Sequence, residues 1–182
     1  VVIKCYGAVS PADISDKVRD EVEEIATRIA QVFELDTTPL FLQAIISEDE
    51  EISVIEFSPR LGGGTCFRLM EKNADFDMLD ASIDSYLNIV NQQEPVRETA
   101  KYLIYQVQAM ECYYDHTEGL EELKEEGIIS DYFFQKTKGM HVTTEKASSA
   151  RIAALLVRGD TVEECFGKLQ EALRRIKVID KD

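Results

Sequence analysis

Apolar residues recur every three or four positions near the start of the chain. This spacing predicts one long amphipathic helix, because it places the side chains on a single helix face. Ser10, Pro11 and Asp13 are residue types that begin helices, so we expect the helix to start there and to end within 36–39. The apolar positions are Ile14, Val18, Val22, Ile25, Ile29 and Phe33.

Two extended runs follow the helix. They cover residues 40–47 and 52–58, and the acidic stretch 48–51 between them is typical of a hairpin loop. If the loop consists of those residues, Ser47 faces Ile52 across the hairpin. The two runs therefore predict an antiparallel pair of strands.

This expected pairing brings three oxygen-bearing side chains together. Gln43 would lie directly opposite Glu56, with Cβ atoms about 4.5–5.5 Å apart. Ser58 would share the face of Glu56, because strand side chains alternate with a period of two. The sequence therefore predicts a convergent set of oxygen donors, Gln43, Glu56 and Ser58.

The rest of the chain alternates between strand and helix patterns. Strands are expected at 1–6, 128–136, 151–158 and 178–179, and one or two strands at 101–114; helices are expected at 77–91, at 118–126 and after Thr161. Thr161 and Glu164 form a capping box, which marks a helix start. Because the hairpins make neighbouring strands antiparallel, the expected fold class is α+β, a mostly antiparallel sheet with flanking helices.

Composition narrows the function classes. The 182 residues are 45% hydrophobic and 30% charged, which is typical of a globular protein. A formal net charge of −15 disfavours nucleic-acid binding, because a phosphate backbone would repel it. The apolar runs are far shorter than the roughly 20 residues that span a bilayer, and these residues show no signal-like pattern of a charged and an apolar region. Four scattered cysteines favour reduced thiols and a cytoplasmic protein.

The oxygen donors suggest a magnesium site. Mg²⁺ takes one or two protein oxygens and leaves its other positions to water and phosphates. Arg60 follows the second strand, and its planar guanidinium suits a carboxylate or a transferring phosphoryl group. Backbone N–H groups of Gly62, Gly63 and Gly64 could hold an anion.

The segment 54–64, Val-Ile-Glu-Phe-Ser-Pro-Arg-Leu-Gly-Gly-Gly, resembles the metal-binding segment of the ATP-grasp superfamily. The strand carrying Gln43 is similar to the family strand that supplies a Glu or Gln ligand. Residues 139–165 resemble the β-rich unit that ends ATP-grasp ligases. Ser58 stands where the family usually has Asn, and its shorter hydroxyl is expected to reach a metal through water.

The resemblance implies an ATP-grasp C-terminal lobe. It implies that residues 1–94 are the C-terminal half of the catalytic lobe and 95–182 a small β-rich subdomain. It also implies ATP and Mg²⁺ or Mn²⁺ as cofactors, Gln43, Glu56 and Ser58 as metal ligands, and Arg60 as the catalytic residue that holds an acyl phosphate or a substrate carboxylate. The partners would be small carboxylates and amines, with no nucleic acid and no membrane.

Only the C-terminal half of the usual enzyme is covered by the resemblance, and the chain opens without an initiator Met, so we expect a domain fragment that is inactive alone. An apolar face left open could pair two copies into a homodimer. Three functions stay open: a carboxylate–amine ligase, a carbamoyl-phosphate synthase or biotin carboxylase-like domain, and a non-catalytic binding module. From the strand pattern alone, Glu56 and Arg60 could equally form a surface ion pair.

Overall fold

The computed structural model describes residues 5–96, 100–146 and 148–181. Contacts divide the chain into two compact units, which are described separately. The hairpin unit is Ala12–Val96, and the sheet unit comprises the described residues of Val1–Pro11 and Arg97–Asp182. Among the described residues, no helix is long and apolar enough to span a membrane.

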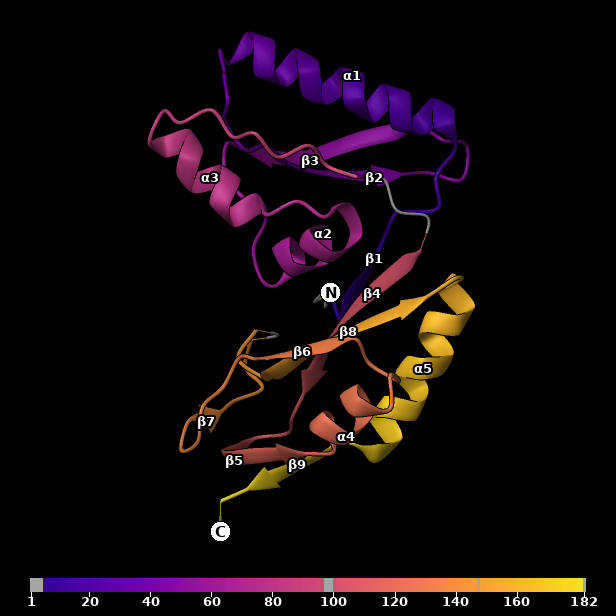
Figure 1. Ribbon diagram of the computed structural model, residues 1–182, viewed down its shortest axis with the longest axis vertical. Helices are drawn as coiled ribbons and strands as arrows, with labels where there is room; N and C mark the ends of the chain where they lie inside the picture. The colour runs from indigo at the N-terminus through magenta and orange to yellow at the C-terminus, as the bar shows by residue number, and fades with distance from the viewer. Residues whose placement is uncertain (1–4, 97–99, 147, 182) are drawn as a thin grey trace. The chain divides into compact units, whose positions relative to one another are not determined.

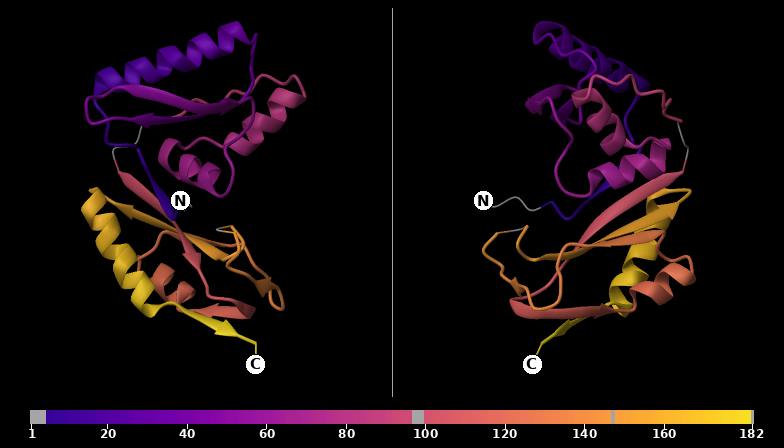
Figure 2. Two further views of the ribbon diagram at one scale, coloured as in Figure 1. Left: turned by 180° about the vertical axis from the view of Figure 1, so that it is seen from behind. Right: turned by 60° about the vertical axis from the view of Figure 1, so that its left-hand side comes forward.

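In the hairpin unit a long helix covers one face of a two-stranded hairpin (Figure 1). Two short helices lie on the other side of the hairpin in each view (Figure 2). The elements are α1 (Asp16–Val32), β2 (Phe41–Ile46), β3 (Ile52–Ser58), α2 (Cys66–Ala74) and α3 (Met78–Tyr86).

Helix α1 begins later than the sequence pattern predicted. Ser15 is the N-cap residue, and its hydroxyl accepts a hydrogen bond from the Val18 backbone N–H at 3.2 Å. The predicted start at Ser10 and Pro11 was wrong, because Ser10 ends strand β1 (Gly7–Ser10), where it pairs with Tyr102. The local residue types suited a helix start, but strand pairing with a distant segment took priority.

The hairpin pairs Gln43 with Glu56 as predicted, although the turn differs. Ser47 N–H donates to the Glu51 carbonyl at 3.0 Å, so the loop is one residue shorter than expected and Ser47 does not face Ile52. Glu50 closes it in the left-handed conformation, at φ 62°. Gln43 pairs with Glu56, but its neighbour Ala44 pairs with Val54, so β3 contains one extra residue at this point. This β-bulge offsets the shorter loop and restores the predicted pairing.

The two short helices end at left-handed residues. Helix α3 is capped by Asp77, whose carboxylate accepts from the Leu79 and Asp80 backbone N–H groups. The helix ends before the predicted position 91, because Asn88 adopts a left-handed conformation at φ 56°. Helices commonly end at a residue in this conformation. The sequence pattern did not predict α2, which ends at Asp75.

The sheet unit holds two antiparallel sheets, and α5 packs on β4 and β8 of the larger one (Figure 1). The strand orders are β1-β4-β8-β6 and β7-β5-β9. The remaining elements are β4 (Lys101–Gln108), β5 (Cys112–Glu118), α4 (Leu120–Glu125), β6 (Asp131–Phe134), β7 (His141–Val142), β8 (Arg151–Gly159), α5 (Val162–Arg175) and β9 (Lys177–Asp180). Together with the hairpin unit, these elements confirm the α+β class and its mostly antiparallel pairing.

The main hydrophobic core lies in the sheet unit. Central strand β8 is buried from Ile152 to Val157, and Leu155 and Val157 are fully buried. Cys165 and Leu169 of α5 pack into the same cluster. By contrast, the hairpin unit leaves many large apolar side chains exposed. The sheet unit therefore contains most of the apolar burial that stabilises this chain.

Contacts divide the chain after Val96, whereas the assignment of 1–94 to a catalytic-lobe half and 95–182 to a β-rich subdomain stays a prediction. The N-terminal strand differs, because β1 pairs with β4 and so belongs to the sheet unit. The expected strand at 1–6 lies partly outside the described residues, since 1–4 are not described.

Candidate functional site

Helix α1 covers one face of the hairpin. The opposite face lies on the side of α2 and α3 but keeps exposed side chains, and we call it the open face. Phe57 points toward α1, where its ring lies 4.9 Å from the ring of Phe33. Because side chains alternate along a strand, Glu56 and Ser58 point away from α1. Their strand partners Gln43 and Phe41 share that open face. The predicted oxygen donors therefore lie together on the face opposite α1.

Gln43 and Glu56 are exposed, and Ser58 is half-buried. Among the described residues, their side chains make no hydrogen bond or ion pair with one another or with a neighbour. An amide oxygen, a carboxylate and a hydroxyl with no competing partner fit a Mg²⁺ ion, which needs few protein ligands when phosphates complete its shell. No cluster of three or more His, Cys, Asp or Glu residues suited to a metal occurs in the described part. The set thus supplies a single carboxylate.

Arg60 is positioned by an aromatic ring. Its guanidinium carbon lies 5.5 Å from the centroid of the Phe41 ring. Its Nη1 donates to the Leu61 carbonyl at 2.7 Å. Other guanidinium N–H groups remain available to an anion at the same end of the hairpin as Ser58. The sequence analysis missed Phe41, although its place opposite Ser58 in the predicted register could have revealed it.

The glycine loop lies against the same ring. A Cβ atom built on Gly62 would come within 3.1 Å of Cδ2 of Phe41, whereas one on Gly63 would meet nothing within 4 Å. Gly64 adopts φ 73°, which favours glycine. The loop leads through Thr65 into α2, so backbone N–H groups and a helix N-terminus follow Arg60 directly.

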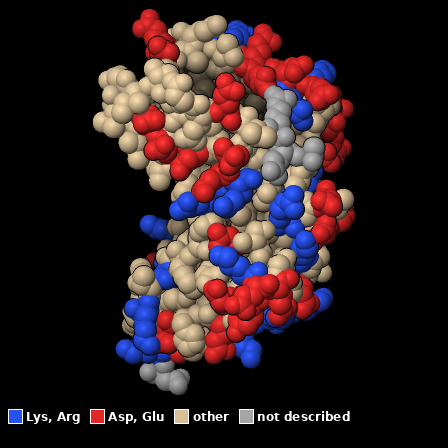
Figure 3. Space-filling view, in the orientation of Figure 1, with Lys and Arg blue, Asp and Glu red and all other residues tan. Residues whose placement is uncertain are grey.

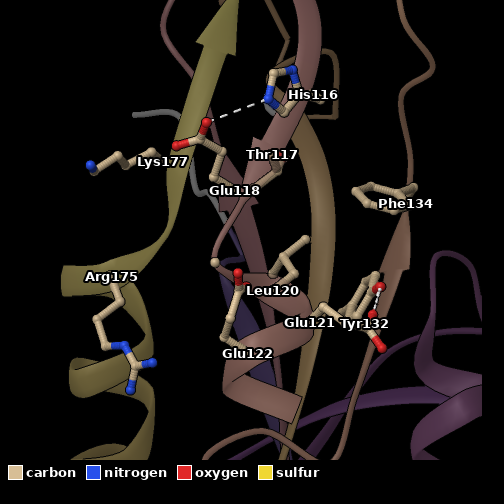
Figure 4. A pocket seen from close by; sticks show the side chains of 11 residues that line it. His116, Thr117, Glu118, Leu120, Glu121, Glu122, Tyr132, Phe134, Arg175 and Lys177 are labelled. Carbon is tan, nitrogen blue, oxygen red and sulfur yellow. Dashed lines mark hydrogen bonds and ion pairs between the residues drawn. The ribbon is translucent and has the colours of Figure 1, made fainter. Parts of the chain in front are cut away.

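A cavity of about 490 Å³ lies in the sheet unit (Figure 4). Its charged groups are largely paired with one another or with neighbours. Tyr132 donates to Glu121 at 2.6 Å, which raises the pKa of the Tyr132 hydroxyl. Arg175 binds both carboxylate oxygens of Glu126 at 2.6 Å, and His116 lies 3.6 Å from Glu118. We assign this cavity no function.

The two histidines form pairs with carboxylates at the surface. His116 Nδ1 lies 2.7 Å from Asp115, and His141 Nε2 lies 3.1 Å from Glu111. Lys138 also contacts Asp115, and together with His116 it lowers the pKa of that carboxyl. All four cysteines are free thiols, and Cys165 is buried in the core. Charged residues cover much of the visible surface, and acidic side chains occur on both units (Figure 3).

Comparisons with known proteins give structural matches only. No protein-family model matches the chain, and no curated protein matches it by sequence. Phosphoribosylglycinamide synthetase from Anaerococcus prevotii matches with a TM-score of 0.80 and 16% identity, over 97% of this chain and 45% of the other. L-amino acid ligase from Bacillus licheniformis matches with a TM-score of 0.81 and 16% identity, over 100% and 45%.

A third match is the biotin carboxylase domain of 2-oxoglutarate carboxylase from Hydrogenobacter thermophilus, in complex with MgADP and bicarbonate. Its TM-score is 0.73 at 12% identity, over 96% of this chain and 39% of the other. The chain thus spans less than half the length of the structures it matches. At these identities the likeness establishes the fold alone, an α+β arrangement that covers less than half of each matched chain.

Proposed function

We propose that this chain is the C-terminal part of an ATP- and Mg²⁺-dependent ligase that joins a carboxylate to an amine. One observation carries the proposal. Gln43 lies directly opposite Glu56 on the open hairpin face, and Arg60 and the glycine loop follow at the end of that strand. The structural likeness to a synthetase and to an amino acid ligase supports a ligase reaction at this arrangement.

Gln43 and Glu56 would hold Mg²⁺ or Mn²⁺, with Ser58 acting directly or through water. A divalent ion supplies charge neutralisation for ATP phosphates during phosphoryl transfer. The carboxylate of Glu56 balances part of the ion's charge, while the neutral donors leave room for phosphate oxygens. A site with a single carboxylate is therefore suited to a metal that arrives bound to a nucleotide.

Arg60 would bind the substrate carboxylate and then the acyl phosphate made from it. The carboxylate oxygen attacks the γ-phosphorus of ATP, the bond to ADP breaks, and an acyl phosphate forms. An amine then attacks the carbonyl carbon and releases phosphate and a proton. Arg60 stays in contact with the phosphoryl oxygens in both steps, with its guanidinium held over Phe41. Backbone N–H groups of Gly62–Gly64 would stabilise the same negative charge.

The whole reaction needs more than this chain. The matched enzymes are more than twice as long, so the remaining nucleotide-binding parts would come from elsewhere. We expect these 182 residues alone to bind ATP poorly and to be inactive. A reducing compartment such as the cytoplasm suits the four free thiols.

Two alternatives have specific support. The match to a biotin carboxylase domain with bicarbonate favours bicarbonate as the carboxylate that is phosphorylated. Ser58 in place of the usual Asn favours a non-catalytic module that keeps the fold. With bicarbonate, only the substrate would differ from the proposal. A non-catalytic module would have no ligase activity.

Metal binding by this chain tests the site directly. Mn²⁺ added to ¹⁵N-labelled protein should broaden the amide signals near Gln43 and Glu56, because the ion is paramagnetic. Glu56→Gln should abolish the broadening. Glu48→Gln, on the exposed loop of the same hairpin, is the matched control and should not. Equal broadening in wild type and Glu56→Gln would refute the metal assignment.

Turnover tests the reaction. The protein that carries this chain should release ADP and phosphate with Mg²⁺ when given a suitable carboxylate and amine. Bicarbonate belongs in the panel, and release that depends on it would favour the carboxylase alternative. Metal binding without ADP release for any pair of substrates would favour the non-catalytic module.

A further inference from the structure

An uncharged cavity of about 280 Å³ lies in the hairpin unit. One face of α3 forms a wall, since Met78, Ala81, Ser82 and Ser85 lie three or four residues apart. None of the described residues that line it is charged. The remaining lining residues are Thr37, Pro39, Phe76, Ile89, Val90 and Asn91.

Hydrogen bonds hold the walls of the cavity in place. The Asn91 side-chain amide donates to Asp84 of α3 at 2.8 Å. Gln93 accepts from the Asp77 backbone N–H at 2.8 Å and donates to Asp80 at 3.3 Å. These bonds tie the segment after α3 back to the helix, so the cavity does not depend on a ligand to form.

Ser82 is the polar group inside this apolar wall. It is only 8% exposed, and its hydroxyl has no hydrogen-bond partner among the described residues. The Ser82 oxygen is not among the fully buried unpaired side-chain atoms of the described residues, so it can still exchange a hydrogen bond with an occupant. An occupant with an apolar body and one polar edge would fit both features of the wall.

A short stretch of chain links the cavity to the aromatic ring that holds Arg60. Pro39 lines it, and Phe41, whose ring lies under the Arg60 guanidinium, is only two positions further along the chain. Two residues span at most about 7 Å, even when fully extended. A carboxylate on Arg60 and an apolar group in the cavity could therefore belong to one small molecule.

We propose that this cavity binds the apolar side chain of the carboxylate held by Arg60. The inference rests on the proposed function and names its substrate class, a carboxylic or amino acid with a branched aliphatic or aromatic side chain. An engineered protein cavity of about 150 Å³ holds benzene, so a cavity of 280 Å³ has room for a six-membered ring. Charged side chains are excluded, because the lining offers them no counter-ion.

The test is a titration of the ¹⁵N-labelled chain with acetate, butanoate and 3-phenylpropanoate. All three should shift the amide signals of residues 60–65, and only the longer acids should shift those of α3. Each methylene that enters the cavity should tighten binding about three- to fourfold, because burying a CH₂ group is worth about 0.8 kcal/mol.

Variants separate the cavity from the anion site. Ser82→Leu fills the cavity. Acids with longer side chains should then bind no more tightly than acetate, and acetate binding should be unchanged. Ser85→Leu, on the same wall, is a second test in case the first variant misfolds. Ser130→Leu makes the same replacement at an exposed position of the sheet unit and should have no effect.

Each failure has a distinct signature. Acetate and 3-phenylpropanoate binding equally well at residues 60–65 would overturn the cavity assignment and leave Arg60 as the carboxylate site. Undiminished 3-phenylpropanoate binding at α3 in Arg60→Gln would also overturn it, since the cavity would then act without Arg60. If no acid shifts residues 60–65, the proposed role of Arg60 fails and this inference fails with it. Absence of ADP release alone would affect only the proposed function.

Discussion

Replacing Gly62 with alanine should weaken anion binding through the Phe41 ring. The new Cβ atom would lie 3.1 Å from Cδ2 and 3.3 Å from Cε2 of that ring, closer than carbon atoms normally pack. The ring must therefore move, and Arg60 lies over its face at 5.5 Å. The substitution at Gly62 therefore affects Arg60 indirectly, through the position of the Phe41 ring.

The magnitude follows from the interaction that is lost. An exposed cation–π contact contributes about 0.5–1 kcal/mol, so carboxylate or phosphate binding should weaken about two- to fivefold. Stability should change little, because alanine also restricts the unfolded chain, which stabilises by about 0.4–1 kcal/mol where the native backbone permits it. Binding should thus change while the free energy of unfolding hardly does.

The assay is an NMR titration with acetate and with inorganic phosphate on four proteins that form a double-mutant cycle. They are wild type, Gly62→Ala, Phe41→Leu and the double variant. Gly63→Ala is the matched control, since its Cβ would meet nothing within 4 Å. The reasoning is refuted if Gly63→Ala weakens binding as much, or if Gly62→Ala keeps its full effect after Phe41→Leu.

Three further predictions concern stability and association. Ser15→Ala should destabilise α1 by about 1 kcal/mol through loss of its N-cap, as measured by urea unfolding, whereas Ser15→Asn should be nearly neutral. Arg175 lowers the pKa of Glu126 below its usual 4.5, so this pair stabilises the fold above that pH and less as the pH falls through the lowered value. Glu126→Gln should therefore make unfolding less dependent on pH below 4.5, and an unchanged pH profile would contradict this. Phe33 is 57% exposed beside an apolar groove, so Phe33→Asp should abolish any homodimer seen by analytical ultracentrifugation.

Much of the hairpin could be predicted from local pattern. Strand β3 has the predicted bounds at 52–58, and Gln43 pairs with Glu56 as expected. Part of that agreement came from two compensating differences. The loop is one residue shorter than predicted, and the bulge restores the offset. Alternation of apolar and polar residues fixes which face a side chain takes, but it carries no signal for an extra residue in one strand.

The sequence by itself determined the α+β class, the long amphipathic helix and the oxygen donors on one hairpin face, because periodicity and residue chemistry are local properties. Tertiary structure alone decided the features that depend on contacts between distant segments. Ser10 lies in a strand that pairs with β4, so it does not cap the helix, and Ser15 is the N-cap residue instead. Packing placed the Phe41 ring under Arg60 and against Gly62, and hydrogen bonds to α3 shaped the cavity around Ser82. Such contacts depend on the folded geometry and not on periodicity, so the alternation of apolar and polar residues does not encode them.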